Sequence, residues 1–326
     1  MSRKTFFAFF VIFFSPTLIK TILAWGFRGH QEINRAAVFT LPDGLFGFYK
    51  KHIDFVSAHA VDPDKRRYAD PDEAPRHFID LDRYGEHPFD SLPRHWEDAV
   101  TKYGVDSLKA HGIVPWHVMV MFYRLTAAFK AKDAAAILRH SADIGHYIAD
   151  AHVPLHCTKN YNGQLTNQHG IHGLWESRLP ELFDGDYDRI TGTSAYLSNP
   201  SEAIWAALKD SYAAKDSVLE LEKKLSSEFP EHRKFAYEQR GRQLVRVYSR
   251  SYCTAYHEAL DGMVERRMNA AIRIVGAFWY SAWVNAGMPE LYFEGQANPE
   301  STLIAEQDSL DKRPGNHSLP MHGHED

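Results

Sequence analysis

The stretch DAAAILRHSADIGHYIADAH, residues 133–152, decides the fold class of this chain. Its apolar residues recur at intervals of three and four, which predicts an amphipathic helix that stops near Pro154, because proline cannot continue a helix. The preceding stretch VPWHVMVMFYRLTAAFKAK has the same spacing and predicts another helix from about residue 116. Segments at 231–252 and 255–286 are expected to be helical as well. Because strand signals are weak, we expect an all-α, mainly helical single domain.

Both ends of the chain differ from this helical middle part. Residues 1–24 are typical of a secretory signal, with Arg3 and Lys4 before the apolar run FFAFFVIFF and Ala24 at the expected cleavage site. That run is shorter than the about 20 apolar residues that span a bilayer, which favours an exported, periplasmic or secreted protein over an uncleaved membrane anchor. From residue 298 the sequence is polar and predicts a disordered tail at 298–326, which leaves one domain at 25–297.

The charge balance argues against a broad basic surface. The chain has 37 lysines and arginines against 42 acidic residues, a net charge of −5, so its surface as a whole is poorly suited to gripping long polyanions. Recognition of phosphate would need a local positive centre, such as bound metal ions. Cys157 and Cys253 could pair after export, but two cysteines do not form a disulfide scaffold, and the sequence leaves their pairing open.

Histidines and carboxylates are most concentrated in HYIADAHVPLHC, residues 146–157. His146 and Asp150 stand four residues apart, so their side chains leave the same face of a helix and can hold one ion between them. Zinc accepts imidazole nitrogen and carboxylate oxygen at about 2.0–2.2 Å, which suits this spacing. His156 lies beyond Pro154, past the expected helix end, and could serve a neighbouring ion.

A second pair with the same spacing follows in HGLWE, which contains His172 and Glu176. Either pair alone is compatible with ordinary polar residues on a helix surface, but both together favour metal binding. Two further candidates lie upstream, His77 in EAPRHFIDLD and Asp62 in AVDPDK, fifteen residues before it. Composition does not choose between Asp62 and three nearby alternatives: Asp64, Asp70 and Asp72.

Trp25 would become the first residue of the mature chain if the signal is removed after Ala24. The α-amino group has an unperturbed pKa of only about 7.7–8.0, and metal binding favours the deprotonated form of a ligand. The amine and carbonyl of Trp25 could therefore chelate one ion, and His30, about one helical turn further on, could complete the site. The alternative is that Trp25 is simply a core aromatic residue near the cleavage site.

The motifs WGFRGH, AVD with HFID fifteen residues on, HxxxD, DAHVPLH and HxxWE, in this order, resemble the zinc-dependent phospholipase C and single-strand nuclease superfamily. The resemblance covers residues 25–180, with a helical continuation to about 290. It implies a secreted, mainly helical fold with three Zn²⁺ ions in a cleft. One ion would be held by Asp62, His77, His146 and Asp150; the second by Trp25 and His30 with Asp150 as a bridge; and the third by His156, His172 and Glu176.

The resemblance also implies a reaction, and it selects one of the candidate aspartates as a metal ligand. The family's fifteen-residue interval selects Asp62 over Asp64. Two neighbouring zinc ions would share a water and lower its pKa, so that hydroxide attacks the phosphorus of a phosphodiester while the third ion offsets charge on the leaving oxygen. Asp62 is expected to act as the catalytic residue that orients or deprotonates this water.

The substrate expected from the resemblance is single-stranded DNA or RNA, cleaved to 5′-nucleotides. The WGxxGH form and the HFID motif match the nuclease branch, where Phe78 would stack on a base and Asp80 would bind its edge. The simpler interpretation of Phe78 is a buried aromatic. Glu176 and the sixteen residues from His156 to His172 are nearer to phospholipase C, which is the alternative. A non-enzymatic zinc-binding protein is a third possibility. We expect a monomer without an organic cofactor.

Overall fold

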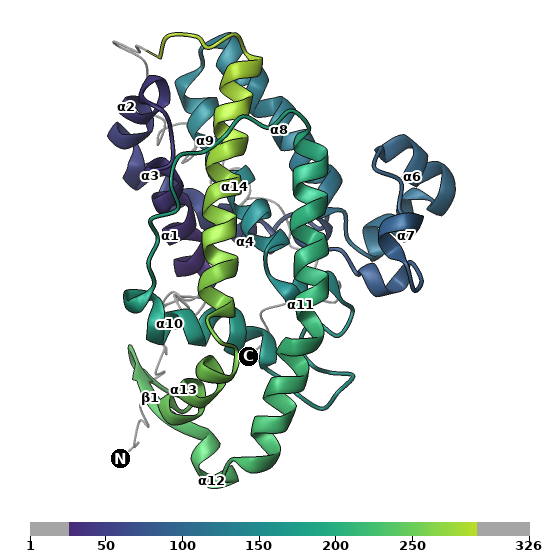
Figure 1. Cartoon of the computed structure of the whole chain (residues 1–326), viewed down its shortest axis with the longest axis vertical. Coiled ribbons are helices and arrows are strands. Elements are labelled where there is room, and N and C mark those ends of the chain that lie inside the picture. The colour runs from purple at the N-terminus through teal and green to yellow at the C-terminus, as the bar shows by residue number, and fades with distance from the viewer. Residues whose placement is uncertain (1–25, 292–326) are drawn as a thin grey trace, which may run out of the picture.

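A computed structural model describes residues 26–291 and is mainly helical, with one two-stranded sheet (Figure 1). The expectation of an all-α chain therefore needs one correction, at that sheet. The predicted signal at 1–24, Trp25 and the predicted tail at 298–326 lie outside the described residues. Along residues 26–291, no helix is both long and apolar enough to cross a membrane.

The described α-helices are α1 (Gly26–Val38), α2 (Asp43–Lys51), α3 (Ile53–Ala58), α4 (Asp62–Arg66), α5 (Pro88–Ser91), α6 (Trp96–Tyr103), α7 (Val105–Ala110), α8 (Val114–Ala131), α9 (Ala134–Ala151), α10 (Leu179–Phe183), α11 (Pro200–Glu228), α12 (Glu231–Lys234), α13 (Arg250–Ala259) and α14 (Met263–Asn285). The short 3₁₀ helices are η1 (His59–Val61), η2 (Ala74–His77), η3 (Leu81–Arg83), η4 (Pro154–Cys157) and η6 (Asp184–Asp186). The element η5 (Gly173–Arg178) is a π-helix, and the strands are β1 (Phe235–Arg240) and β2 (Gln243–Tyr248).

The long helices α8, α9, α11 and α14 form the frame of the molecule (Figure 1). The helices predicted at 133–152 and from about residue 116 are confirmed as α9 and α8. Asp133 caps α9 by accepting a hydrogen bond from the backbone N–H of Ala136 at 3.0 Å. In the core, Trp279 of α14 stacks on Tyr49 of α2 with ring centroids 4.8 Å apart and donates Nε1–H to the carbonyl of Ser141 in α9. One aromatic residue thus joins three helices.

The predicted helix at 231–252 is wrong, because this segment forms α12, an antiparallel hairpin and the start of α13. The strands β1 and β2 pair from Phe235 with Tyr248 to Arg240 with Gln243, which leaves a two-residue turn. Gly241 in that turn has a φ of 60°, which glycine adopts without the steric cost of a Cβ. The high charge of the segment conceals the alternation of exposed and covered side chains along each strand.

Two other segments differ from their predictions in detail. The helix expected at 255–286 is divided between α13 and α14, because Asp261 and Gly262 between them have positive φ values of 48° and 71°. The second segment is 60–92, whose many prolines and aspartates predict a long ordered loop; it contains α4, η2, η3 and α5. Of these, α4 and η2 contact α9 and bring acidic and histidine side chains to it.

Gly145 allows α1 and α9 to approach each other closely. A Cβ built on Gly145 would overlap the side-chain amide of Asn34, which donates hydrogen bonds to the carbonyls of Val56 and Ala142 at 3.1 Å each and so cannot move freely. We expect Gly145→Ala to lower the free energy of unfolding by about 1–3 kcal/mol, despite the better helix propensity of alanine. Urea unfolding measures this. Gly47→Ala, whose Cβ would meet no atom within 4 Å, should instead stabilise α2; equal shifts for both variants would contradict the steric argument.

Candidate metal centre

Eight buried histidine and acidic side chains meet around the C-terminal half of α9. This helix provides His146 and Asp150, and the others come from α1, α4, η2, η4 and the residues in and just before η5. Each of the eight is at most 7% exposed: His30, Asp64, His77, His146, Asp150, His156, His172 and Glu176. The centre is therefore assembled from segments that are far apart in the sequence.

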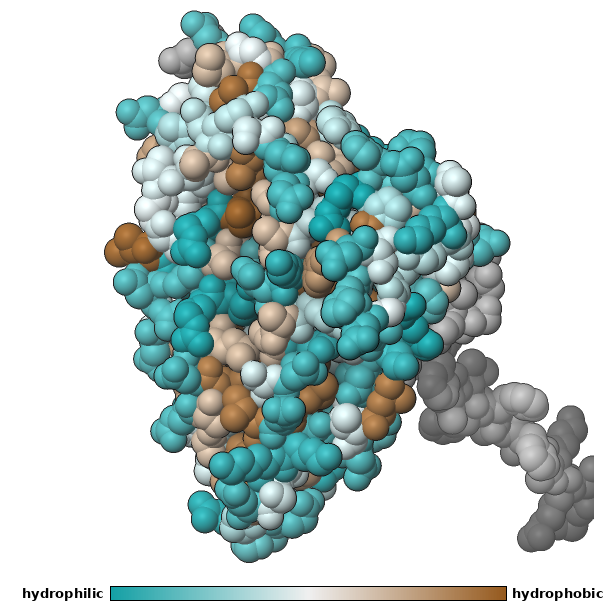
Figure 2. Space-filling view, turned by 45° about the vertical axis from the view of Figure 1, so that its right-hand side comes forward, coloured by the Kyte–Doolittle hydropathy of each residue, from teal (hydrophilic) through white to brown (hydrophobic). Residues whose placement is uncertain are grey.

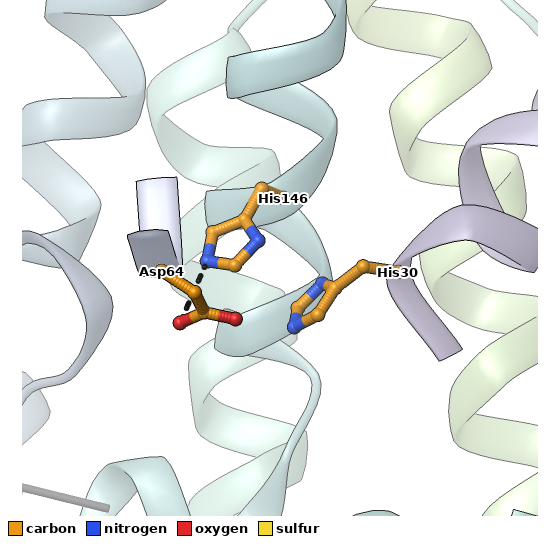
Figure 3. A group of neighbouring side chains, drawn as sticks. All are labelled: His30, Asp64 and His146. Atoms are coloured by element: carbon orange, nitrogen blue, oxygen red, sulfur yellow. Dashed lines mark ion pairs between the residues drawn. The ribbon is translucent and has the colours of Figure 1, made fainter. Parts of the chain in front are cut away.

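The first group of these side chains comprises His30, Asp64, His77, His146 and Asp150. Oδ2 of Asp150 is 2.9 Å from Nδ1 of His77 and 3.2 Å from Nε2 of His146, and its Oδ1 is 3.4 Å from Nε2 of His30. Oδ1 of Asp64 is 3.7 Å from the same nitrogens of His77 and His146. Figure 3 shows Asp64, His146 and His30 directed toward one another. Ligands of a tetrahedral zinc ion lie about 3.4 Å apart when each is about 2.1 Å from the metal, so these separations suit shared ions.

His156, His172 and Glu176 form a second group next to the first. Oε2 of Glu176 is 2.7 Å from Nε2 of His172 and 3.3 Å from Nε2 of His156. Glu176 belongs to the π-helix, a rare conformation that occurs frequently at functional sites. The two groups adjoin, because Oε1 of Glu176 is 3.8 Å from Nε2 of His30 and Nδ1 of His156 is 3.9 Å from Oδ1 of Asp150. These buried clusters could hold more than one metal ion.

The outer nitrogens of three imidazoles determine which atoms face the centre. Nδ1 of His146, His156 and His172 lies 2.8, 2.7 and 3.3 Å from a backbone carbonyl oxygen, and since a carbonyl can only accept, each Nδ1 carries the proton. The Nε2 atoms of neutral rings therefore present lone pairs toward the carboxylates. Imidazole lone pairs and carboxylate oxygens that face each other need positive charge between them. Divalent metal ions would supply it, and the hydrogen bond on the outer nitrogen of each of these histidines is typical of a metal ligand.

The pKa values of His146, His156 and Asp150 also show that positive charge is stabilised at the centre. Burial disfavours the imidazolium of His146, but the carboxylates of Asp150 and Asp64 outweigh it and raise the pKa of His146 to about 9. Burial is likewise outweighed at His156, where Asp150 and Glu176 raise the pKa to about 9. Burial alone would raise the pKa of Asp150, yet His146 and His156 hold it well below its usual range. Without metal ions, protonated His146 and His156 therefore supply the positive charge that offsets the buried carboxylates.

We expect protein stripped by a chelator to lose stability as the pH rises from 6.5 to about 9. The folded state binds protons at His146 and His156 more tightly than the unfolded chain, so their stabilisation is complete below pH 6.5 and lost as the pH passes about 9. The loss is on the order of 3 kcal/mol for each histidine. Thermal unfolding across this range measures it. Zinc loading at about pH 7.5 should release protons, detectable by calorimetry in buffers of different ionisation enthalpy; no release would contradict the assignment.

Seven of the nine predicted metal ligands are brought together by the fold, and Asp62 is not one of them. Asp62 instead interacts with Nδ1 of His59 at 2.6 Å and with Nζ of Lys65 at 2.7 Å, while Asp64 joins the first group. The physical reason is helical phase: residues two apart in α4 point about 200° away from each other, so only one of the two carboxylates can face α9. We therefore replace Asp62 with Asp64 as candidate ligand.

The predicted base pocket at Phe78 and Asp80 lies between η2 and η3, beside η4. Phe78 is only 8% exposed and Asp80 only 5%. The backbone N–H of Ile79 donates to the carbonyl of His156 at 2.9 Å, which ties this segment to the second group. The covered ring of Phe78 leaves little surface for stacking, so base binding there stays a prediction.

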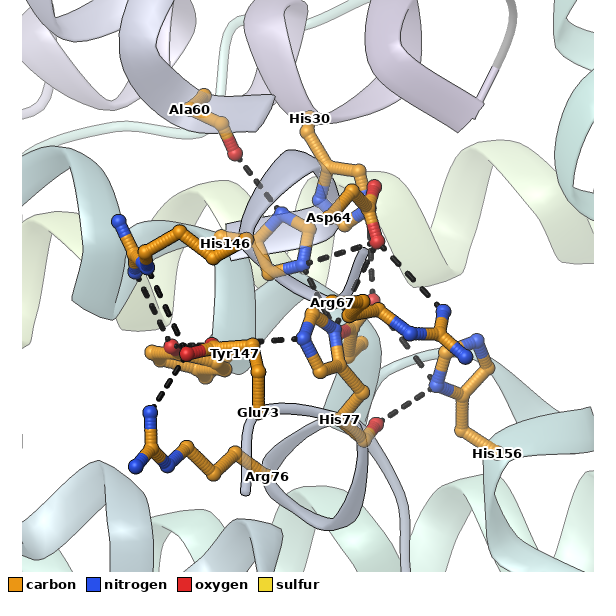
Figure 4. A network of polar contacts seen from close by, with 12 residues as sticks. His30, Ala60, Asp64, Arg67, Glu73, Arg76, His77, His146, Tyr147 and His156 are labelled. Carbon is orange, nitrogen blue, oxygen red and sulfur yellow. Dashed lines mark hydrogen bonds and ion pairs between the residues drawn. The ribbon is translucent and has the colours of Figure 1, made fainter. Parts of the chain in front are cut away.

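Sequence reasoning also missed the charged side chains next to the outer nitrogen of His77, Nε2 (Figure 4). Glu73 is fully buried, accepts hydrogen bonds from Oη of Tyr147 and from Arg76, and has Oε1 3.6 Å from Nε2 of His77. A carboxylate on the outer nitrogen orients a metal-binding imidazole. The available signal was the four-residue spacing of Glu73 and His77 in EAPRH. Arg67 is the other omission; its Nη1 is 3.8 Å from Oδ1 of Asp64, and its side chain is 6% exposed.

Comparison of the chain with protein-family models gives no match, and comparison with curated proteins gives none either.

Proposed function

We propose that the chain is an exported, zinc-dependent phosphodiester hydrolase that uses three Zn²⁺ ions to cleave single-stranded nucleic acid to 5′-nucleotides. The observation that carries this proposal is the pair of adjoining donor groups, in which outer hydrogen bonds fix imidazole lone pairs toward shared carboxylates. Mixed nitrogen and oxygen donors favour zinc over magnesium or calcium, which prefer oxygen ligands alone.

The residues divide among three ions as follows. Asp64, His77, His146 and Asp150 would hold the first, and His156, His172 and Glu176 would hold another. His30 and Asp150 would hold the remaining ion, together with the α-amino group that cleavage before Trp25 would create. When bound, the ions supply positive charge for the phosphate oxygens and lower the pKa of a water molecule.

Two side chains of the first group have proposed roles beyond ligation. Asp64 takes over the role expected of Asp62, to orient or deprotonate the attacking water, because its Oδ1 is placed 3.7 Å from two ring nitrogens of the first group. Arg67 keeps a permanent positive charge beside Asp64 in a buried position. A guanidinium pairs well with two oxygens of a phosphodiester, so we assign Arg67 to the substrate phosphate.

The test uses zinc-loaded protein beginning at Trp25, with a single-stranded oligonucleotide and phosphatidylcholine as parallel substrates. We expect 5′-mononucleotides, no product after chelation, and about three zinc ions per chain that remain when residues 298–326 are deleted, as expected for ordered sites. Protein with one extra residue before Trp25 serves as a matched control and should lose one ion. Cleavage of lipid alone would establish phospholipase C instead, and zinc binding without any hydrolysis would leave a zinc-binding protein.

A further inference from the structure

The hairpin β1–β2 and the residues that flank it carry a net positive charge, whereas the chain as a whole is negatively charged. Residues 231–250 contain six lysines and arginines and two glutamates, whereas the whole chain has a net charge of −5. The hairpin protrudes next to α10 and α13 (Figure 1). A positive protrusion on an otherwise negative protein indicates an anionic partner at this place.

The two faces of the hairpin differ in what they contact. On the inner face, Glu238 accepts from Arg178 at 3.0 Å and Arg240 donates to Glu181 at 2.7 Å, so these charges are used within the protein. We call the opposite side the outer face; it carries the cross-strand pairs Tyr237 with Arg246 and Gln239 with Leu244. At the base of the hairpin the ring of Tyr248, paired with Phe235, stacks on Tyr252 of α13. Tyr237 is 68% exposed and Leu244 is 65% exposed, and neither is covered by another described element.

The arginines of the outer face and the turn keep their charge available. Among residues 26–291, no carboxylate forms an ion pair with Arg242 in the turn or with Arg246 on the outer face. The guanidinium of Arg246 lies 3.5 Å above the ring centre of Phe235, which holds it in place beside Tyr237. An exposed aromatic ring next to a fixed, unpaired guanidinium can stack on a base while it contacts a phosphate.

We propose that the outer face of the hairpin binds single-stranded nucleic acid, with Tyr237 stacked on a base and with Arg242 and Arg246 on phosphates. A membrane surface is the less suitable occupant, because a lipid-binding face needs continuous apolar area and here Gln239 and Arg246 alternate with Tyr237 and Leu244. Over the face of the molecule that Figure 2 presents, hydrophilic residues predominate and hydrophobic residues lie between them. This inference rests on the proposed nuclease function for its substrate class.

The hairpin is anchored to the segment that supplies the second metal group. The carbonyl of Tyr248 accepts from Nε of Arg178 at 3.2 Å, and Oη of Tyr248 donates to the carbonyl of His169 at 3.2 Å. These contacts flank His172 and Glu176 along the chain. A strand bound on the outer face would therefore be held at a fixed position relative to the metal centre, which favours long substrates over short ones.

The experiment measures binding and turnover separately. Binding of a fluorescent, phosphorothioate-linked single-stranded oligonucleotide is followed by anisotropy for the zinc-loaded protein and its variants. We expect Tyr237→Ser to raise Kd about tenfold. Arg242→Gln and Arg246→Gln should each reduce the slope of log Kd against log salt by about 0.7. KM for the oligonucleotide should rise in parallel, while hydrolysis of bis(p-nitrophenyl) phosphate stays unchanged.

Lys209→Gln, an exposed lysine on α11, removes the same charge elsewhere and should leave Kd and KM as they are. Unchanged oligonucleotide binding in all three hairpin variants would overturn the proposal. The proposal would also be overturned if the hairpin variants lost binding to phosphatidylglycerol vesicles but kept oligonucleotide binding. That result would show that the hairpin binds lipid. If the parent protein hydrolyses neither substrate, the proposed function fails, but the anisotropy series still decides the role of the hairpin.

Discussion

Asp64→Asn is expected to lose zinc from the first group and with it phosphodiester hydrolysis, whereas Asp62→Asn keeps both. The Asp64 carboxylate faces His77 and His146, while that of Asp62 is turned toward His59 and Lys65. Removing a hydrogen-bonding partner of a metal ligand already costs about 10–100-fold in affinity, so removing a charged ligand should cost about 100-fold or more. Zinc content after dialysis and kcat on an oligonucleotide measure the effect.

The two variants control each other, because they make the same chemical change two residues apart. Asp62→Asn weakens a contact with Lys65, whose side chain is 45% exposed, so the expected change in stability is below about 1 kcal/mol. The reverse outcome, with zinc lost in Asp62→Asn and kept in Asp64→Asn, would restore the original prediction for Asp62 and show that α4 is rotated relative to the described structure.

Glu73→Gln should be the most destabilising single change near the centre, at about 3 kcal/mol. The carboxylate is fully buried against Arg66, Arg76 and Tyr147. Its loss removes the counter-charge that the two guanidinium groups share, although Arg66 keeps its ion pair with Asp143 and Arg76 keeps its ion pair with Asp70. Burial raises the pKa of Glu73, but the nearby imidazole of His77 and the charges of Arg66 and Arg76 outweigh burial and hold the pKa below its usual value, so the group is ionised when folded. Urea unfolding of chelated protein measures the loss without contributions from metal binding.

The same substitution should also loosen the first metal group. Glu73 faces the outer nitrogen of His77, and losing such a partner costs about 10–100-fold in metal affinity, measurable by competition with a chelator. Asp72→Asn is the matched control, because Asp72 forms an ion pair with Lys109 in which both side chains are well exposed. That variant should change stability by less than about 1 kcal/mol. Equal effects of the two substitutions would show that the buried contacts of Glu73 contribute nothing specific to stability or metal affinity.

Local patterns in the sequence predicted the parts of the molecule that depend on neighbours along the chain. The spacing of apolar residues indicated α8 and α9, because a helix with 3.6 residues per turn buries one face. The pair His146 and Asp150, and the pair His172 and Glu176, followed from the same periodicity; their atoms are 3.2 and 2.7 Å apart. The second pair lies at a π-helix rather than an α-helix, a difference that no residue pattern indicated.

The sequence by itself therefore determined the helical class and the two local pairs of candidate metal ligands. Only the tertiary structure decided which carboxylate of α4 faces the histidines, since that depends on the rotation of a short helix against α9. It also decided the position of Glu73 next to His77 and the hairpin at 235–248, where charged residues conceal the period of two. In each case the deciding contacts join segments distant in the chain, and their geometry is set by packing that local composition does not encode.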